Sequence, residues 1–385
     1  MPIQYQNYNQ GVLQLLVVVT FVFLSSHLYA AEVIREIIIG TAVDYDSNPD
    51  MVKRNQDPVL IYSFVPQFKL SVANESNLWY LDAALLVQRH NNEEVLVNRE
   101  DPKLSIGWDR TYGSGSYGVK LQYAEASARV AELKSTGVFV TGGGNKDATE
   151  KSKILSAKWL HAINPRWSLL TEGGYSDFFY TLPGSLQGYN IADINSKLSY
   201  ANTEKLTTSI QLGYQQLLPD KVLDNTSIAR IIAGAEYEVT DGFKLLSRAG
   251  IYNLTGRQSD TDWEAGIKAE YNKERMNYVA EINRELSPSG VGGFQKIDSL
   301  RLGWIFFMTD HDRVGADFSL YKAKADDQVG FDKLDNKLIG GFYERNLSAH
   351  WKTRVSAGHK QQKIPGAESQ GNLIGISLIY DTLSF

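Results

Sequence analysis

The chain has 385 residues, a formal net charge of −5 and no cysteine, so it lacks the basic excess of most nucleic-acid-binding domains and cannot form disulfides. Its hydrophobic content is 43% and its mean hydropathy is slightly negative, values too low for a bundle of membrane-spanning helices. They suit strands with only one lipid-facing side, for which the many aromatic residues and glycines are also typical. We therefore expect no nucleic-acid partner.

The N-terminus carries a compact apolar block, Val12–Leu24, followed by the small-residue stretch that ends in Ala30 and Ala31. Thirteen helical residues reach only about 20 Å, less than the ~30 Å hydrocarbon core. This favours a signal peptide over residues 1–30, cleaved after Ala30 or Ala31, with residues 31–385 forming one domain. Residues 1–11 contain no Lys or Arg, which is unusual for a signal peptide, and an uncleaved anchor is the alternative.

The mature chain alternates apolar and polar residues in segments joined by turn signals. In Val59–Val72, the even-numbered residues from Leu60 to Val72 are apolar or proline, whereas most of the intervening residues are polar. In Asp262–Asn272 every second residue from Trp263 to Tyr271 is apolar. This period of two predicts strands with one lipid-facing and one aqueous face. A soluble β-sandwich also alternates, but it would have to be unusually large.

The alternation predicts an all-β fold, a single transmembrane antiparallel β-barrel of about eighteen strands, within a range of sixteen to twenty. Short connections alternate with longer polar ones such as 46–58, 91–101, 131–150, 183–188 and 362–370. An even count with both termini in the periplasm follows. The predicted strands are 35–45, 59–72, 78–89, 103–112, 117–125, 152–162, 167–180, 189–201, 206–217, 227–239, 244–254, 261–272, 276–286, 296–308, 313–323, 334–346, 351–361 and 371–385.

Aromatic residues close to the short turns support this orientation, because amphipathic rings collect where a membrane meets water. We predict an inner interfacial ring that includes Trp79, Tyr117, Trp167, Phe243 and Trp351.

The last segment, Ile374–Phe385, is similar to the C-terminal assembly signal of bacterial outer-membrane barrels, because it alternates and closes on Phe385. Leu383 and Phe385 are out of phase with Ile374 and Tyr380, which implies a bulge near Asp381. The resemblance implies recognition by the outer-membrane barrel assembly machinery.

Two early segments, Gly40–Pro49 and Pro58–Phe68, resemble a family of β-barrel porins found in exopolysaccharide operons. In that family a first strand ends in a Tyr-Asp-x-Asn-Pro-type loop and a second strand carries a proline, here Pro66. The resemblance covers residues 40–70 and the last strand. It implies a bacterial outer-membrane pore that passes secreted exopolysaccharide without its own energy source. The expected partners are outer-membrane lipid, lipopolysaccharide and periplasmic components of an export system.

Three local motifs have simpler explanations than a cofactor or metal site. Gly113–Gly118 satisfies G-x-G-x-x-G, but it lies between alternating segments and is typical of a hairpin turn. Asp44–Asp50 has the oxygen spacing that opens a calcium loop, but Pro49 replaces the required glycine. The histidines show no short metal-binding spacing and no local serine partner. We therefore expect no metal, no cofactor and no enzymatic activity.

Charged residues on the polar face of the later strands are the candidate solute path. In a closed barrel the basic ones would form a wall beside an acidic one and select polar or charged solutes. The alternative is that they pair as salt bridges in a non-conducting structural or adhesion barrel; a general diffusion porin is a third possibility. The candidate lumen residues are Arg301, Arg313, Lys337, Arg345, Lys352, Arg354, Glu236, Asp262, Glu264 and Glu281.

Overall fold

The structure is a computed structural model that describes residues 32–53, 56–131, 148–181, 186–220, 225–256, 259–288, 294–325, 334–364 and 367–382. The predicted signal peptide and Phe385 lie outside these ranges and stay predictions. Residues 128–131 form one helical turn. The strands are β1 Glu32–Asp46, β2 Val59–Ala73, β3 Asn77–His90, β4 Arg99–Tyr112, β5 Gly115–Ser127, β6 Thr149–Ala162, β7 Trp167–Tyr180, β8 Tyr189–Ala201, β9 Leu206–Pro219, β10 Thr226–Thr240, β11 Phe243–Thr255, β12 Asp260–Lys273, β13 Met276–Pro288, β14 Phe294–Phe307, β15 Asp312–Ala325, β16 Leu334–Asn346, β17 Trp351–Ile364 and β18 Ala367–Asp381.

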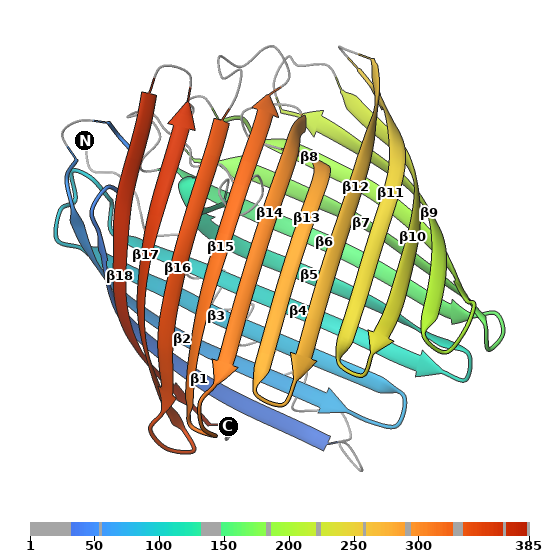
Figure 1. Cartoon of the computed structure of the whole chain (residues 1–385), viewed down its shortest axis with the longest axis horizontal. Helices are drawn as coiled ribbons and strands as arrows, with labels where there is room; N and C mark the ends of the chain where they lie inside the picture. Colours follow the sequence, from blue (N-terminus) through green and yellow to red (C-terminus); the bar gives the residue numbers. More distant parts are fainter. Residues whose placement is uncertain are drawn as a thin grey trace, which may run out of the picture.

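The eighteen strands close into one barrel. Each strand pairs antiparallel with its neighbours in sequence, and β1 pairs with both β2 and β18, which removes every free edge. Figure 1 shows the C-terminal strands as the near wall and the N-terminal strands crossing behind them. The predicted eighteen-stranded antiparallel barrel is confirmed. No helical segment in the described part of the chain has the length and apolar character to traverse a bilayer.

Several strands are longer than the alternation predicted. β1 begins at Glu32 rather than at residue 35, and β4 begins at Arg99 rather than at residue 103. The structure describes β18 only as far as Asp381. The bulge that would shift Leu383 and Phe385 out of phase stays a prediction. A transmembrane strand needs about nine to eleven residues, and these have thirteen to fifteen, so each one continues beyond the hydrocarbon layer. Beyond the hydrocarbon layer the apolar–polar alternation of the sequence is lost, but the backbone hydrogen bonds between strands continue.

Cross-strand pairing identifies two faces around the whole ring. Val43 lies opposite Tyr62 in β2 and Ile376 in β18, and Ile376 lies opposite Val355 in β17. Directly opposed residues share a face, so the pairing can be followed from strand to strand. This outer face carries large apolar side chains that are exposed, such as Val43 at 39% and Ile282 at 62%. The other set of residues forms the lumen face.

An aromatic belt runs along the outer face near the short turns. The predicted Trp79, Tyr117, Trp167, Phe243 and Trp351 all belong to it. Trp79 stacks on Trp108 at 5.4 Å between ring centroids, Trp108 meets Tyr117 at 5.3 Å, and Trp351 meets Tyr380 at 5.0 Å. β1 starts and β18 ends at this short-turn end of the barrel, which in such barrels is the periplasmic side.

One short turn depends on a glycine. Between β10 and β11, Gly242 has φ of +85°, a conformation that residues with a Cβ rarely adopt. A Cβ at this position would lie 2.2 Å from the carbonyl oxygen of Asn272, whose own N–H donates to the Gly242 carbonyl at 2.7 Å. The close approach of β12 therefore requires glycine here.

We expect Gly242→Ala to lower the free energy of unfolding by about 1–3 kcal/mol, because it adds left-handed strain to a backbone collision. Urea unfolding of the protein in detergent micelles, followed by tryptophan fluorescence, measures the change. Gly303→Ala is the matched control, since a Cβ there meets nothing within 4 Å. Equal stability of the two variants would contradict the argument.

Candidate functional site in the barrel lumen

Eight of the ten predicted lumen residues share the lumen face. Arg301, Ser299 and Gly303 alternate along β14 with the outward-facing Leu300 and Leu302, and the same reasoning places the others. The eight are Arg301, Arg313, Lys352, Arg354, Glu236, Asp262, Glu264 and Glu281.

Lys337 and Arg345 were assigned wrongly to the lumen. In β16 they share a face with Ile339, which is 55% exposed and lies opposite Phe318 in β15. Both lie near the ends of the strand, where a long cationic side chain can reach the membrane surface. Alternation could not identify the lumen face of this strand, because Leu338 and Ile339 are both apolar and adjacent.

The lumen charges do not separate into a basic and an acidic wall. They interleave as ion pairs. Arg313 in β15 lies 2.5 Å from Glu344 in β16, Lys244 in β11 lies 3.8 Å from Glu236 in β10, and Arg248 in β11 reaches across β12 to Glu285 in β13 at 3.0 Å. These pairs agree with the alternative in which lumen charges form salt bridges. Glu344 and Arg248, which the prediction of two walls did not include, contribute to them. Charge alternates around the wall instead.

Two predicted arginines are held by aromatic rings rather than by carboxylates. The guanidinium of Arg301 lies 5.3 Å from the ring centroid of Tyr321, and its Nε donates to the tyrosine hydroxyl at 2.8 Å. The guanidinium of Arg354 lies 3.8 Å from the ring centroid of Phe342. Among the described residues, no carboxylate lies within ion-pairing distance of either arginine, so each can interact with a passing solute.

Arg301 and Glu281 line a pocket in the lumen wall of about 420 Å³. Its lining combines cations, carboxylates, amides and hydroxyls, which offer donors and acceptors of both signs. The lumen-facing polar residues that line it are Lys197, Thr207, Ser209, Gln211, Glu236, Arg248, Lys268, Glu281, Asn283, Glu285 and Arg301. We call this the wall pocket.

Glu264 and Asp262 lie outside the wall pocket. Glu264 is 2% exposed, with its carboxylate 3.9 Å from Arg230 and its Oε1 unpaired among the described residues. Asp262 lies beyond the last ladder pair of β12 and β13, Ala265 with Arg284, and contacts Lys296 at 2.7 Å. Both carboxylates therefore form ion pairs in the part of the wall nearer the long loops and do not face the wall pocket.

The long-loop end of the lumen contains a buried apolar cluster that the sequence analysis missed. It includes Ala128 and Ala148, which flank the β5–β6 connection, and lumen-facing residues of β7 to β11. The available signal was a loss of alternation near these strand ends, as in Phe178-Phe179-Tyr180 and Leu217-Leu218. The lumen-facing members are Tyr180, Tyr189, Ile191, Leu217, Ile228, Tyr252 and Leu254.

The β1–β2 connection also folds against the wall at this end. Asn48 is fully buried, and its amide donates to the carbonyls of Val52 and Gln370, each at 2.8 Å. Lys360, which is 3% exposed, donates from Nζ to Asp46 Oδ2 at 2.6 Å. Residues 44–50 have the oxygen spacing that opens a calcium loop, but here Asp46 binds a lysine ammonium and Asn48 binds backbone groups.

A second contact extends across this end of the barrel. Arg129 follows β5, four strands from β1 in the ring, and it donates to Asp50 Oδ1 at 2.7 Å and to the Pro49 carbonyl at 2.8 Å. We call residues 46–52 with Lys360 and Arg129 the mouth clasp. It and the apolar cluster both lie at the long-loop end of the lumen.

The remaining motifs have structural roles in the described residues. Gly113 and Ser114 form the β4–β5 hairpin turn, as predicted. No group of three or more histidine, cysteine or acidic side chains in the described ranges could hold a metal ion. His161 contacts Tyr112 and Ser114 at 3.3 Å on the outer belt, and His350 meets the Asp381 carbonyl at 2.9 Å.

The sequence matches no protein-family model and no curated protein. Solved structures similar in fold include the following three. OccAB4 of Acinetobacter baumannii matches over 92% of this chain and 98% of its own, with a TM-score of 0.52 and 9% identity. OccAB3 of the same organism covers 91% and 99%, with 0.51 and 9%. The FrpB iron transporter of Neisseria meningitidis has a TM-score of 0.50 and 7% identity, and the chain spans 63% of its length.

Identities this low establish the fold alone. Together with the closed ring of eighteen strands, the apolar outer face and the aromatic belt, they place the chain among outer-membrane β-barrels. The protein lies in the bacterial outer membrane.

Proposed function

We propose that the barrel is a passive outer-membrane channel for hydroxyl-rich polar solutes, and that secreted exopolysaccharide is its cargo. The wall pocket is the observation that carries this proposal. It offers Arg301 and Arg248 beside Glu281 and Glu285, together with neutral hydrogen-bonding groups such as Asn283. Sugar hydroxyls both donate and accept hydrogen bonds, so a wall with both kinds of partner can exchange them at little cost.

Movement through such a lumen needs no energy source within this chain. Alternating charges hold water in the lumen and give a neutral or weakly charged solute many equivalent, shallow binding positions. Arg301 lies against Tyr321, a pair that presents a flat surface and a cation together. The proposal includes no catalytic step. Outer-membrane lipid, lipopolysaccharide, the barrel assembly machinery and periplasmic export components are its proposed partners.

The polysaccharide cargo rests on the resemblance of residues 40–70 to porins of exopolysaccharide operons, and the mouth clasp bears on it. A polymer that leaves the lumen would have to pass the contacts of Asp46 and Arg129 at the long-loop end. Planar-bilayer recording tests the proposal: wild-type protein will conduct, and added polysaccharide will increase current noise. A folded barrel without conductance would instead favour the structural or adhesion role, for which the buried apolar cluster and the mouth clasp in the lumen are the supporting observations.

We expect Arg301→Ser to raise the ratio of cation to anion permeability about two- to fivefold. This is the effect of losing one unit charge about 8–16 Å from the ions in water, because the charge acts in opposite directions on cation and anion. Reversal potentials in asymmetric salt measure this ratio. Arg345→Ser removes the same side chain from the outer face and will leave the ratio unchanged. If both variants behave like wild type, Arg301 does not face the conducting path.

A further inference from the structure

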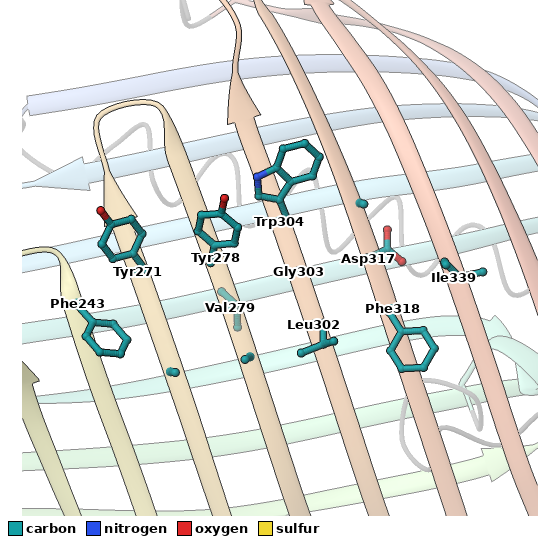
Figure 2. A pocket seen from close by; sticks show the side chains of 13 residues that line it. Phe243, Tyr271, Tyr278, Val279, Leu302, Gly303, Trp304, Asp317, Phe318 and Ile339 are labelled. Carbon is teal, nitrogen blue, oxygen red and sulfur yellow. The ribbon is translucent and has the colours of Figure 1, made fainter.

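The outer wall contains an apolar groove near the short-turn end, with a volume of about 410 Å³. Figure 2 shows it across β11 to β16, with Phe243, Tyr271, Tyr278 and Trp304 toward one end and Leu302, Phe318 and Ile339 further along the strands. The outward-facing residues that line it are Phe243, Ala269, Tyr271, Tyr278, Ala280, Leu302, Trp304, Ala316, Phe318 and Ile339.

Small residues create the hollow. Ala269 in β12 lies directly opposite Ala280 in β13, and Ala316 in β15 lies opposite Gly341 in β16. On each side of β14, a pair of strands therefore has almost no side chain on its outer face at these positions. Leu302 and Trp304 form a ridge between the two pairs. The volume is well above the ~150 Å³ of an apolar cavity that accepts benzene. The groove therefore has room for a hydrocarbon chain.

The position of the groove fixes what can fill it. It begins at the aromatic belt, which marks the periplasmic interface, and continues toward the middle of the outer face, where the surroundings are hydrocarbon. In this environment a groove is filled by van der Waals packing, since no water is expelled. An acyl chain that enters from the periplasmic leaflet has the shape and direction of the groove.

Two cations lie beside the entrance. Lys273 ends β12, and Arg275 follows it in the β12–β13 turn, two residues from Tyr271 and three from Tyr278 respectively. Both are exposed, and among the described residues neither has a carboxylate within ion-pairing distance. A lysine and an arginine at the level of the headgroups can both bind a phosphate, the arginine in a bidentate manner.

We propose that this groove is a phospholipid-binding site, in which one acyl chain occupies the groove and the lipid phosphate contacts Lys273 and Arg275. The lipid is a glycerophospholipid of the periplasmic leaflet. The site lies on the opposite side of the wall from the wall pocket, so it is independent of the channel proposal. A lipid held there would fix the height of the barrel in the membrane.

Native mass spectrometry of the full-length protein in detergent, with added palmitoyl-oleoyl phosphatidylethanolamine, tests the proposal. Wild-type protein will retain the lipid. Ala280→Phe fills the groove, and Ala157→Phe places the same ring on the outer face of β6, on a distant part of the wall. Only Ala280→Phe will weaken retention, by about tenfold, equivalent to about 1.4 kcal/mol.

The double variant Lys273→Gln/Arg275→Gln separates the phosphate from the acyl chain and leaves the strands' packing untouched, so it remains informative if Ala280→Phe does not fold. Its retention of lipid will fall, whereas binding of an uncharged alkyl detergent will not. Equal retention by wild type and the double variant would overturn the phosphate contact. Equal losses in Ala280→Phe and Ala157→Phe would overturn the groove. Loss of a dimer in Ala280→Phe with unchanged lipid would show that a second copy occupies it.

Discussion

Lys360→Met will lower the free energy of unfolding of the barrel by about 3–5 kcal/mol. Lys360 and Asp46 are 3% and 8% exposed, and their 2.6 Å contact compensates both charges. Removal of the lysine leaves the carboxylate buried without a cation, which is the costly way to break such a pair. Urea unfolding of the protein in lipid vesicles measures the loss.

Two further variants show where the cost arises. In Lys360→Met/Asp46→Leu both charges are replaced by apolar groups, and most of the stability will return, because a well-packed apolar pair can equal a buried ion pair. Lys268→Met breaks the accessible lumen pair of Lys268 with Glu270 and will cost less than about 1 kcal/mol. If the double variant is as unstable as the single one, the charge argument for the mouth clasp is wrong.

Leu212→Arg will impair membrane insertion and destabilise the barrel by about 2–4 kcal/mol, the cost of an arginine facing lipid near the middle of a bilayer. Leu212 lies at the centre of β9 on the outer face and is 56% exposed. Gln211→Arg, one residue earlier, places the same side chain in the lumen and will cost less than about 1 kcal/mol. Folding yields into vesicles, read by the shift in electrophoretic mobility without heating, compare the two. Similar yields would reverse the assignment of faces in β9.

The sequence was sufficient for the barrel because one physical demand repeats in every strand. Lipid on one side and water on the other impose a period of two, and Asp262–Asn272 or Lys352–Lys360 follow it closely enough to identify both faces. The same demand placed Trp79 and Trp351 in the belt. Strand ends were less accurate, since backbone pairing continues through polar residues such as Arg99 that alternation does not reveal.

The site was harder to predict for a different reason. Whether a lumen residue faces water, an opposing charge or a buried cluster depends on neighbours that are distant in sequence. Glu264 is polar and lumen-facing, yet Arg230 lies beside it and almost no water reaches it. Leu217 and Ile228 occupy lumen positions because other parts of the chain cover them. In β16 apolar residues lie on both faces, so the alternation could not show which face carries Lys337.

The pairing of Lys360 with Asp46 joins residues 314 positions apart, at the seam where β18 meets β1. Neither the seam nor this contact can form until almost the entire chain has been synthesised, because each joins residues from opposite ends of the sequence. Up to that moment two unpaired strand edges exist, each a template for association with another chain. Closure is therefore a late, long-range event with a large entropic cost, and a partly assembled ring is the state most exposed to aggregation.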